Sequence, residues 1–224
     1  MDAMTWMQAV QETVTRQTAW DFLASGGPMM VPLGLCSVVA CGLAMERYLR
    51  LRPAAVLPPE LEPVIDRAVR GERAAALVEC AAIDSPASRI LAAGLRRDAL
   101  PLVDLERGME DQAGKEMERM RGNIRALSVI AAVAPLLGLL GTVLGLNAAF
   151  HRVVQTGLGK PENLAAGIEE ALITTIAGLG LAIPAMLVAS HLGARVRRLV
   201  GRVDDRLLPV IDAIVQERRR GDAA

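Results

Sequence analysis

Three long stretches without a charged residue constrain the fold of this 224-residue chain more than any other feature of its sequence. They cover residues 26–45, 126–150 and 171–190. About 20 helical residues cross a hydrocarbon layer of about 30 Å, so each stretch is long enough to span a membrane. A buried helix of a large soluble protein is the alternative, but the chain has too little polar sequence to surround three such helices. The stretches therefore predict an all-α integral membrane protein with three transmembrane helices.

The first stretch differs from a cleaved signal peptide in two ways. It follows the acidic residues Asp2, Glu12 and Asp21, and it is longer than the apolar core of an ordinary signal peptide. We therefore expect it to be retained as a transmembrane helix.

The charge of the chain is balanced overall but unevenly distributed. The 25 Lys and Arg residues equal the 25 Asp and Glu residues in number, which gives no global attraction to nucleic acid, so we expect no nucleic-acid partner. Of the 25 basic residues, only three lie before the first stretch or between the second and third: Arg16, Arg152 and Lys160. By the positive-inside rule, the N-terminus is predicted to lie on the outer side of the membrane and the C-terminus on the cytoplasmic side.

These observations divide the chain into seven predicted segments. In order, they are an extracytoplasmic N-terminal segment (1–25), transmembrane helix 1 (26–46), a cytoplasmic helical segment (47–125), transmembrane helix 2 (126–150), a periplasmic loop (151–163), transmembrane helix 3 (164–193) and a cytoplasmic C-terminal helix (194–224). Apolar residues recur at helical intervals over 62–82 and again in the tail, from Leu199 to Ile214. We expect the second and third transmembrane helices to extend into a cytoplasmic helical bundle, packed within one chain or between copies.

Small residues line one face of the second and third predicted spans. Because small side chains let helix backbones approach closely in a membrane, these positions predict helix packing. Together with two prolines in the same spans, the residues assigned to packing are Gly138, Gly141, Gly145, Gly178, Pro135 and Pro184. The hydroxyl groups of Thr142 and Thr175 either bond a carbonyl one turn back or share one polar layer between the helices.

Two carboxylates, Glu169 and Glu170, precede the third uncharged stretch. Either both mark the membrane boundary with their charges in water, or burial disfavours the charged form of one of them, which can then load and release a proton. Thr174 lies one helical turn inward from Glu170, so a polar line from Glu170 to Thr174 or Thr175 is geometrically available.

Two segments carry a family resemblance. The sequences APLLGLLGTVLG (134–145) and GIEEALITTIAGLGLAIP (167–184) resemble the two signature segments of the MotA/TolQ/ExbB proton-channel family. The segment GGPMMVPLGLCS (26–37), followed by Glu46-Arg47, resembles the first span of ExbB, so the chain is most similar to ExbB within the family. Glu169 departs from the pattern, which more often has a small or short polar residue there. Ala189-Ser190-His191 stands where Tyr-Asn often follows the proline.

The resemblance implies an ion-conducting subunit of the bacterial inner membrane. It implies a homo-oligomeric ring, a pentamer in the family, around an ExbD- or TolR-like partner whose single span carries the proton-binding aspartate. Carried over by position, the signatures make Thr142, Glu170 and Thr175 residues of the proton path, to which the polar line adds Thr174. The extra carboxyl of Glu169 leaves open which of the two glutamates titrates.

The energy source and the pathway can also be predicted from the sequence. The sequence has no nucleotide-binding loop, metal cluster or nucleophile constellation, so we expect no enzyme activity, no metal and no cofactor, with protons as the coupling ion. The ExbB-like first span favours powering of TonB-dependent outer-membrane import, with a TonB-like protein and membrane lipid as further partners. The alternatives are a TolQ-like part in the Tol-Pal envelope and cell-division system, and a non-conducting membrane scaffold. A MotA-like motility stator usually has a fourth span.

Overall fold

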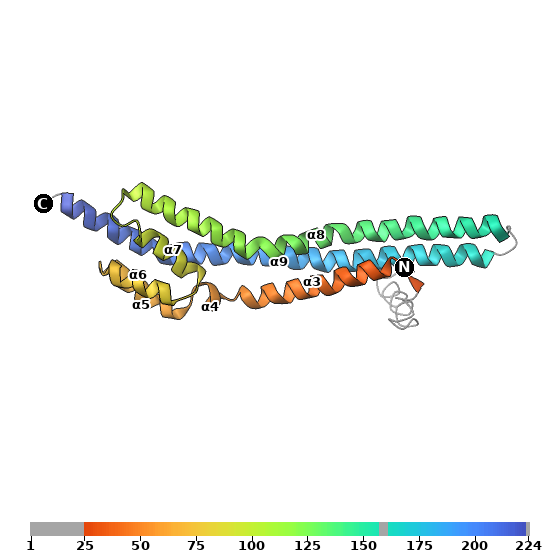
Figure 1. Ribbon diagram of the computed structural model, residues 1–224, viewed down its shortest axis with the longest axis horizontal. Coiled ribbons are helices and arrows are strands. Elements are labelled where there is room, and N and C mark those ends of the chain that lie inside the picture. Colours follow the sequence, from red (N-terminus) through yellow and green to blue (C-terminus); the bar gives the residue numbers. More distant parts are fainter. Residues whose placement is uncertain (1–24, 157–160, 223–224) are drawn as a thin grey trace, which may run out of the picture. The chain divides into compact units, whose positions relative to one another are not determined.

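The computed structural model describes residues 25–156 and 161–222 (Figure 1). Within these residues every regular element is a helix and none is a strand, which confirms the all-α prediction. The helices are α3 (Met30–Arg50), α4 (Pro53–Val56), the short 3-10 helix η1 (Pro59–Leu61), α5 (Glu62–Val69), α6 (Arg73–Ala82), α7 (Pro86–Leu95), α8 (Leu102–Thr156) and α9 (Pro161–Asp222). Nearly all of the predicted N-terminal segment lies outside the described residues.

In the part of the chain that the structure describes, three helices are long and apolar enough to cross a membrane: α3, α8 and α9. Helices α8 and α9 each continue without a break from an apolar segment into a charged one, which confirms the predicted extension of the second and third spans. Pro135 lies inside α8 and Pro184 inside α9. Neither proline ends its helix, because neighbouring groups can compensate for a missing backbone donor in a membrane. Most of the predicted 151–163 loop is helical, since α8 ends at Thr156 and α9 begins at Pro161.

The chain forms two compact units, and α3, α8 and α9 contribute to both. Among the described residues, the first unit comprises those up to Gly42 and those within 127–188, and so contains most of the three apolar stretches. The second unit comprises residues 43–126 and 189–222.

The first unit has a small core and an apolar exterior. Met30 and Leu33 of α3 pack with Ala134 of α8 and Ala182 of α9. Helices α8 and α9 lie antiparallel and side by side in this unit (Figure 1). Large apolar side chains point outward, including Val31, Leu136, Leu172 and Leu187. A lipid-embedded bundle presents such side chains to acyl chains and uses small residues between its helices.

The second unit packs the short helices α5, α6 and α7 with the charged parts of α8 and α9. The predicted apolar stripe of the tail is buried in this unit, at Leu199, Val203, Leu207, Val210 and Ile214. The apolar pattern over 62–82 corresponds to two helices rather than one. Helix α5 ends before Gly71, whose φ of 90° lies in the left-handed region that glycine adopts without steric cost.

Candidate functional site

Helices α8 and α9 approach each other closely through glycine. A Cβ atom built on Gly178 would lie 2.7 Å from the carbonyl oxygen of Ala134, and one on Gly138 would lie 3.1 Å from that of Thr174. One on Gly145 would lie 3.2 Å from the carbonyl oxygen of Gly167. The structure therefore leaves little room for any side chain between the two backbones.

The other positions assigned to packing lie in different surroundings. A Cβ atom on Gly141 would collide with the side chain of Thr174, so this glycine also lies at the α8–α9 contact. Pro135 is half-buried in α8, whereas Pro184 is exposed on α9. Within the described chain Pro184 thus has an outward-facing ring, available to lipid or to another protein.

The hydroxyl groups of Thr142 and Thr175 have different acceptors. Thr142 donates to the carbonyl oxygen of Leu139 on its own helix, at 2.6 Å. Thr175 donates across the helix contact to the carbonyl oxygen of Gly138, at 3.4 Å. In the described part of the chain, no hydrogen bond joins these two threonines. Thr142 bonds a carbonyl of its own helix, as one of the two alternatives predicts, whereas Thr175 bonds the neighbouring helix.

Thr174 connects α9 to the turn that precedes α3. Its side chain is buried, with 1% of the residue exposed. Its Oγ1 atom lies 3.0 Å from the carbonyl oxygen of Gly26 and 2.7 Å from that of Glu170. One hydroxyl has a single proton to donate, so these two carbonyl oxygens compete for it. The hydrogen bond between Thr174 and Glu170 is thus made by the backbone carbonyl of Glu170 and not by its carboxylate.

The two neighbouring glutamates have different environments. Glu169 is exposed, whereas Glu170 is half-buried. The Oε2 atom of Glu170 lies 4.0 Å from Nη2 of Arg152 on α8. Its Oε1 atom lies against the backbone of Gly27, where an added Cβ atom would overlap it. Partial burial and a neighbouring cation make Glu170 the more strongly held of the two carboxylates.

Sequence reasoning did not find the contribution of Gly26, Gly27 and Arg152 to this site. In the sequence, the two glycines belong only to the segment that resembles the first span of ExbB, and Arg152 is only one of three basic residues on the predicted outer side of the membrane. Two consecutive glycines directly before a helix are a signal for close backbone approach or a positive φ. That signal does not reveal which distant side chain makes the approach.

A separate polar cluster lies in the second unit, around Glu116 of α8. Its side chain is 2% exposed and accepts bonds at 2.9 Å from Nε and Nη2 of Arg89 on α7. Gln112 and Arg119 also donate to it, at 2.8 and 2.9 Å. Burial acts to raise the pKa of Glu116, but the hydrogen bonds and positive charge of Arg89, with Arg119 and Gln112, outweigh it and lower the pKa below its ordinary value. The carboxylate is therefore held in its charged form.

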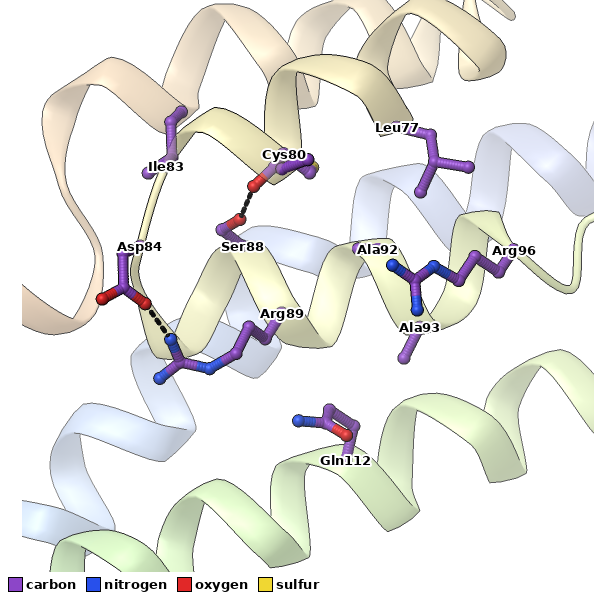
Figure 2. A pocket seen from close by; sticks show the side chains of 11 residues that line it. Leu77, Cys80, Ile83, Asp84, Ser88, Arg89, Ala92, Ala93, Arg96 and Gln112 are labelled. Carbon is purple, nitrogen blue, oxygen red and sulfur yellow. Dashed lines mark hydrogen bonds and ion pairs between the residues drawn. The ribbon is translucent and has the colours of Figure 1, made fainter.

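Next to this cluster is an open cavity of about 450 Å³ between α6, α7 and α8 (Figure 2). Arg89 pairs with Asp84 at its rim, and the hydroxyl of Ser88 donates to the carbonyl oxygen of Cys80, at 2.6 Å. Burial is the largest influence on the Cys80 thiol and raises its pKa. A buried thiol with a raised pKa is a poor nucleophile, so Cys80 is typical of a cysteine that packs between helices.

Comparison with known proteins gives a consistent result. A model of the MotA/TolQ/ExbB proton channel family matches residues 82–205, which is more than half of the chain. The biopolymer transport protein ExbB-like 1 of Synechocystis is 37% identical over 176 residues, which cover 75% of this chain and 68% of the relative. An ExbB homolog of Methanothermobacter thermautotrophicus is 30% identical over 192 residues, which cover 85% of this chain and 66% of the relative.

A further relative has a different name within the same family. The Tol-Pal system protein TolQ of Pseudomonas aeruginosa is 32% identical over 109 residues, which cover 49% of this chain and 47% of the relative. The chain spans about two thirds of the length of the first two relatives and about half of TolQ. The family match, the two signature segments at the α8–α9 contact and the three apolar helices agree. The chain is a multi-pass membrane protein of the MotA/TolQ/ExbB proton channel family, and within that family it is most like ExbB.

Proposed function

We propose that this chain is the channel subunit of an ExbB–ExbD-type motor, which converts the proton motive force into mechanical work and energises TonB-dependent outer-membrane import. The observation that carries the proposal is the half-buried Glu170 carboxylate at the α8–α9 contact, with Arg152 beside it and buried Thr174 one turn away. Two relatives with ExbB in their names support the ExbB assignment. The bacterial inner membrane is the proposed location, with the N-terminus periplasmic and the C-terminus cytoplasmic.

The proposed assembly is a pentameric ring around a single-span partner similar to ExbD or TolR. The outward faces of α8 and α9 support it, because they expose large apolar side chains such as those of Leu136 and Leu172 together with the half-buried Thr142, whose hydroxyl bonds its own helix. In a membrane, small and polar residues on a helix face favour packing against another helix. A partner helix or a neighbouring copy would cover these faces. Membrane lipid and a TonB-like protein are further proposed partners.

In the proposed mechanism, Glu170 accepts and releases protons, while Thr142, Thr174 and Thr175 supply hydroxyl groups along the path between Glu170 and the partner's aspartate. One elementary charge that crosses 100 mV releases about 2.3 kcal/mol. Protons are the proposed coupling ion, and we propose that the motor needs no cofactor. Each transferred proton then supplies a small step of work, so turning one component against the other requires repeated transfer.

Replacement of single glutamates in cells tests this function. The Glu170→Ala variant should abolish proton-driven uptake while the ring still assembles, because the variant removes the titratable group but little packing. Glu169→Ala is the matched control: its carboxylate is exposed in the structure, and the variant should retain uptake. Uptake through a named outer-membrane receptor and ring assembly by native mass spectrometry are the two measurements. Undiminished uptake by Glu170→Ala would contradict the proposal.

A TolQ-like role in envelope constriction is the second candidate, and the similarity to the Tol-Pal protein of Pseudomonas aeruginosa favours it. The two candidates differ in what fails when the chain is deleted from its host. Loss of siderophore-dependent growth with normal cell constriction supports the import motor. Delayed constriction and outer-membrane leakage with normal import support the TolQ-like role.

A further inference from the structure

A tight turn precedes α3 and lies against two polar groups of α9. The backbone N–H of Met30 donates to the carbonyl oxygen of Gly27 at 3.1 Å, and that of Val31 donates to the carbonyl oxygen of Pro28 at 3.3 Å. Gly27 has a φ of 64°, in the left-handed region that L side chains rarely adopt. Gly26 is buried, and a Cβ atom there would lie 2.5 Å from Cγ of Met30 and 3.1 Å from Cγ2 of Ile173, so the Met30 side chain would have to move. The backbone conformation therefore favours glycine at residue 27, and close packing favours a small residue at residue 26.

Each glycine of this turn contacts a different polar group of the proposed proton path. The carbonyl oxygen of Gly26 accepts from the hydroxyl of Thr174, at 3.0 Å. The Cα of Gly27 lies so close to Oε1 of Glu170 that a Cβ atom at residue 27 would overlap that oxygen, which would have to move. The location of the Glu170 carboxylate thus depends on the absence of a side chain at residue 27.

The other oxygen of the same carboxylate faces a cation. Oε2 of Glu170 lies 4.0 Å from Nη2 of Arg152, so the carboxylate lies between the Gly27 backbone and the Arg152 guanidinium. The Arg152 side chain is 45% exposed and that of Glu170 is 24% exposed. An ion pair at that exposure is modest in strength. It can therefore orient the carboxylate and still release it.

We propose that the Gly26–Gly27 turn and Arg152 are positioning residues for the proton path: the turn fixes where the Glu170 carboxylate and the Thr174 hydroxyl lie, and Arg152 orients the carboxylate from its other side. The inference rests on the proposed function, because it assigns a role relative to Glu170. It gives α3, through the turn before its first residue, a direct part in conduction in addition to packing.

The test is proton flux into proteoliposomes that contain the full chain and its partner. Gly27→Ala should lower the flux at least about tenfold, because displacement of a reacting group by about 1 Å can cost about 100-fold in rate. Gly34→Ala is the matched control in α3, since an added Cβ atom there has no neighbour within 4 Å. This control should leave flux unchanged.

A second substitution separates positioning from general damage to the fold. In the Gly27→Ala background, Glu170→Asp shortens the side chain that collides and should raise the flux, whereas in the wild-type background the same substitution should lower it. Such a reversal of sign occurs only when the two positions are coupled. If Glu170→Asp lowers flux equally in both backgrounds, the proposed contact has no role.

Variants of Arg152 provide a readout that does not depend on folding of the Gly27→Ala protein. Arg152→Lys keeps the positive charge and should retain most of the flux, whereas Arg152→Gln removes the charge and should lower it. A wild-type complex without flux would overturn the proposed function itself. A conducting wild type, with Gly27→Ala equal to Gly34→Ala and Arg152→Gln equal to Arg152→Lys, would overturn only the positioning role.

Discussion

At the scale of single residues, three threonines near the α8–α9 contact use their hydroxyl groups differently. Thr142 donates to a carbonyl of its own helix, Thr175 donates to Gly138 of the other helix, and buried Thr174 donates either to Gly26 or to Glu170 of its own helix. A hydroxyl group that already donates a hydrogen bond can still accept another through its lone pairs. All three hydroxyl groups can therefore take part in a proton path. Thr174 also bonds the turn before α3, and Thr175 also bonds α8.

Replacement of these threonines by valine should lower proton flux and leave the ring assembled. Valine has nearly the same shape as threonine but no hydroxyl group, and one lost hydrogen bond costs about 1 kcal/mol in stability. Thr175→Ser keeps the hydroxyl and should retain flux, so it is the control for Thr175→Val. Flux in proteoliposomes and ring size by native mass spectrometry are the measurements. Collapse of the ring in Thr142→Val or Thr175→Val would instead indicate a packing role.

At the scale of elements, the antiparallel pair α8–α9 depends on backbone contact. Gly178 faces the backbone of α8, whereas Gly180, two residues along the same helix, has no neighbour within 4 Å of an added Cβ atom. Alanine favours a helix over glycine by about 1 kcal/mol, so only a steric conflict makes this substitution destabilising.

Gly178→Ala should therefore destabilise the chain by about 1–3 kcal/mol, the usual cost of overpacking a tight contact. Gly180→Ala should be neutral or slightly stabilising, because its new methyl group meets open space within the chain. The measurement is thermal unfolding of the two variants in the same detergent. Equal midpoints for both variants would show that the α8–α9 contact is not as close as described.

The second unit has its own test at Glu116, where a buried carboxylate pairs with Arg89. Glu116→Gln should cost about 1–3 kcal/mol in unfolding free energy, because it weakens the charged hydrogen bonds to Arg89, whose side chain is 36% exposed and still pairs with Asp84. Glu118→Gln is the control: that side chain is 51% exposed, and an exposed ion pair contributes at most about 1 kcal/mol. Equal losses of unfolding free energy in the two variants would contradict the role assigned to Glu116.

The pH dependence of stability follows from the lowered pKa of Glu116. The folded chain binds a proton at Glu116 less readily than the unfolded chain, in which the carboxyl has its ordinary pKa of 4.5. The stabilisation by the ion pair with Arg89 is therefore complete above pH 4.5. It is lost as the pH falls through the lower pKa that Glu116 has in the folded chain. Glu116→Gln should remove this part of the acid sensitivity. An acid unfolding curve of unchanged shape in the variant would show that another group controls it.

At the scale of the whole molecule, the chain separates an apolar unit from a charged one, and its zero net charge conceals this division. The uncharged stretches were sufficient to predict three long helices, because a membrane sets the length of a spanning helix. The break at Gly71 was missed, since apolar residues keep helical spacing on both sides of it. Sequence reasoning also missed that Glu116 is buried, because a charged helix face does not reveal which carboxylate meets an arginine from another helix.

The candidate site was predictable only in part for a similar reason. Thr142, Glu170 and Thr175 are predicted from the family signatures, and Thr174 from its helical spacing to Glu170; both patterns are local in sequence. The turn at Gly26 and Gly27 touches residues more than 140 positions away in the chain, for example Thr174. Local patterns carry no information on such a contact, so it required the structure.

We propose that Glu170 carries protons through a complex of this chain and its partner. Proton flux driven by a potassium diffusion potential, measured in proteoliposomes with and without the partner, tests it most directly. We predict partner-dependent flux for the wild type and for Glu169→Ala, and none for Glu170→Ala. A wild-type complex that conducts no protons, as a scaffold would, or full flux through Glu170→Ala, would contradict the claim.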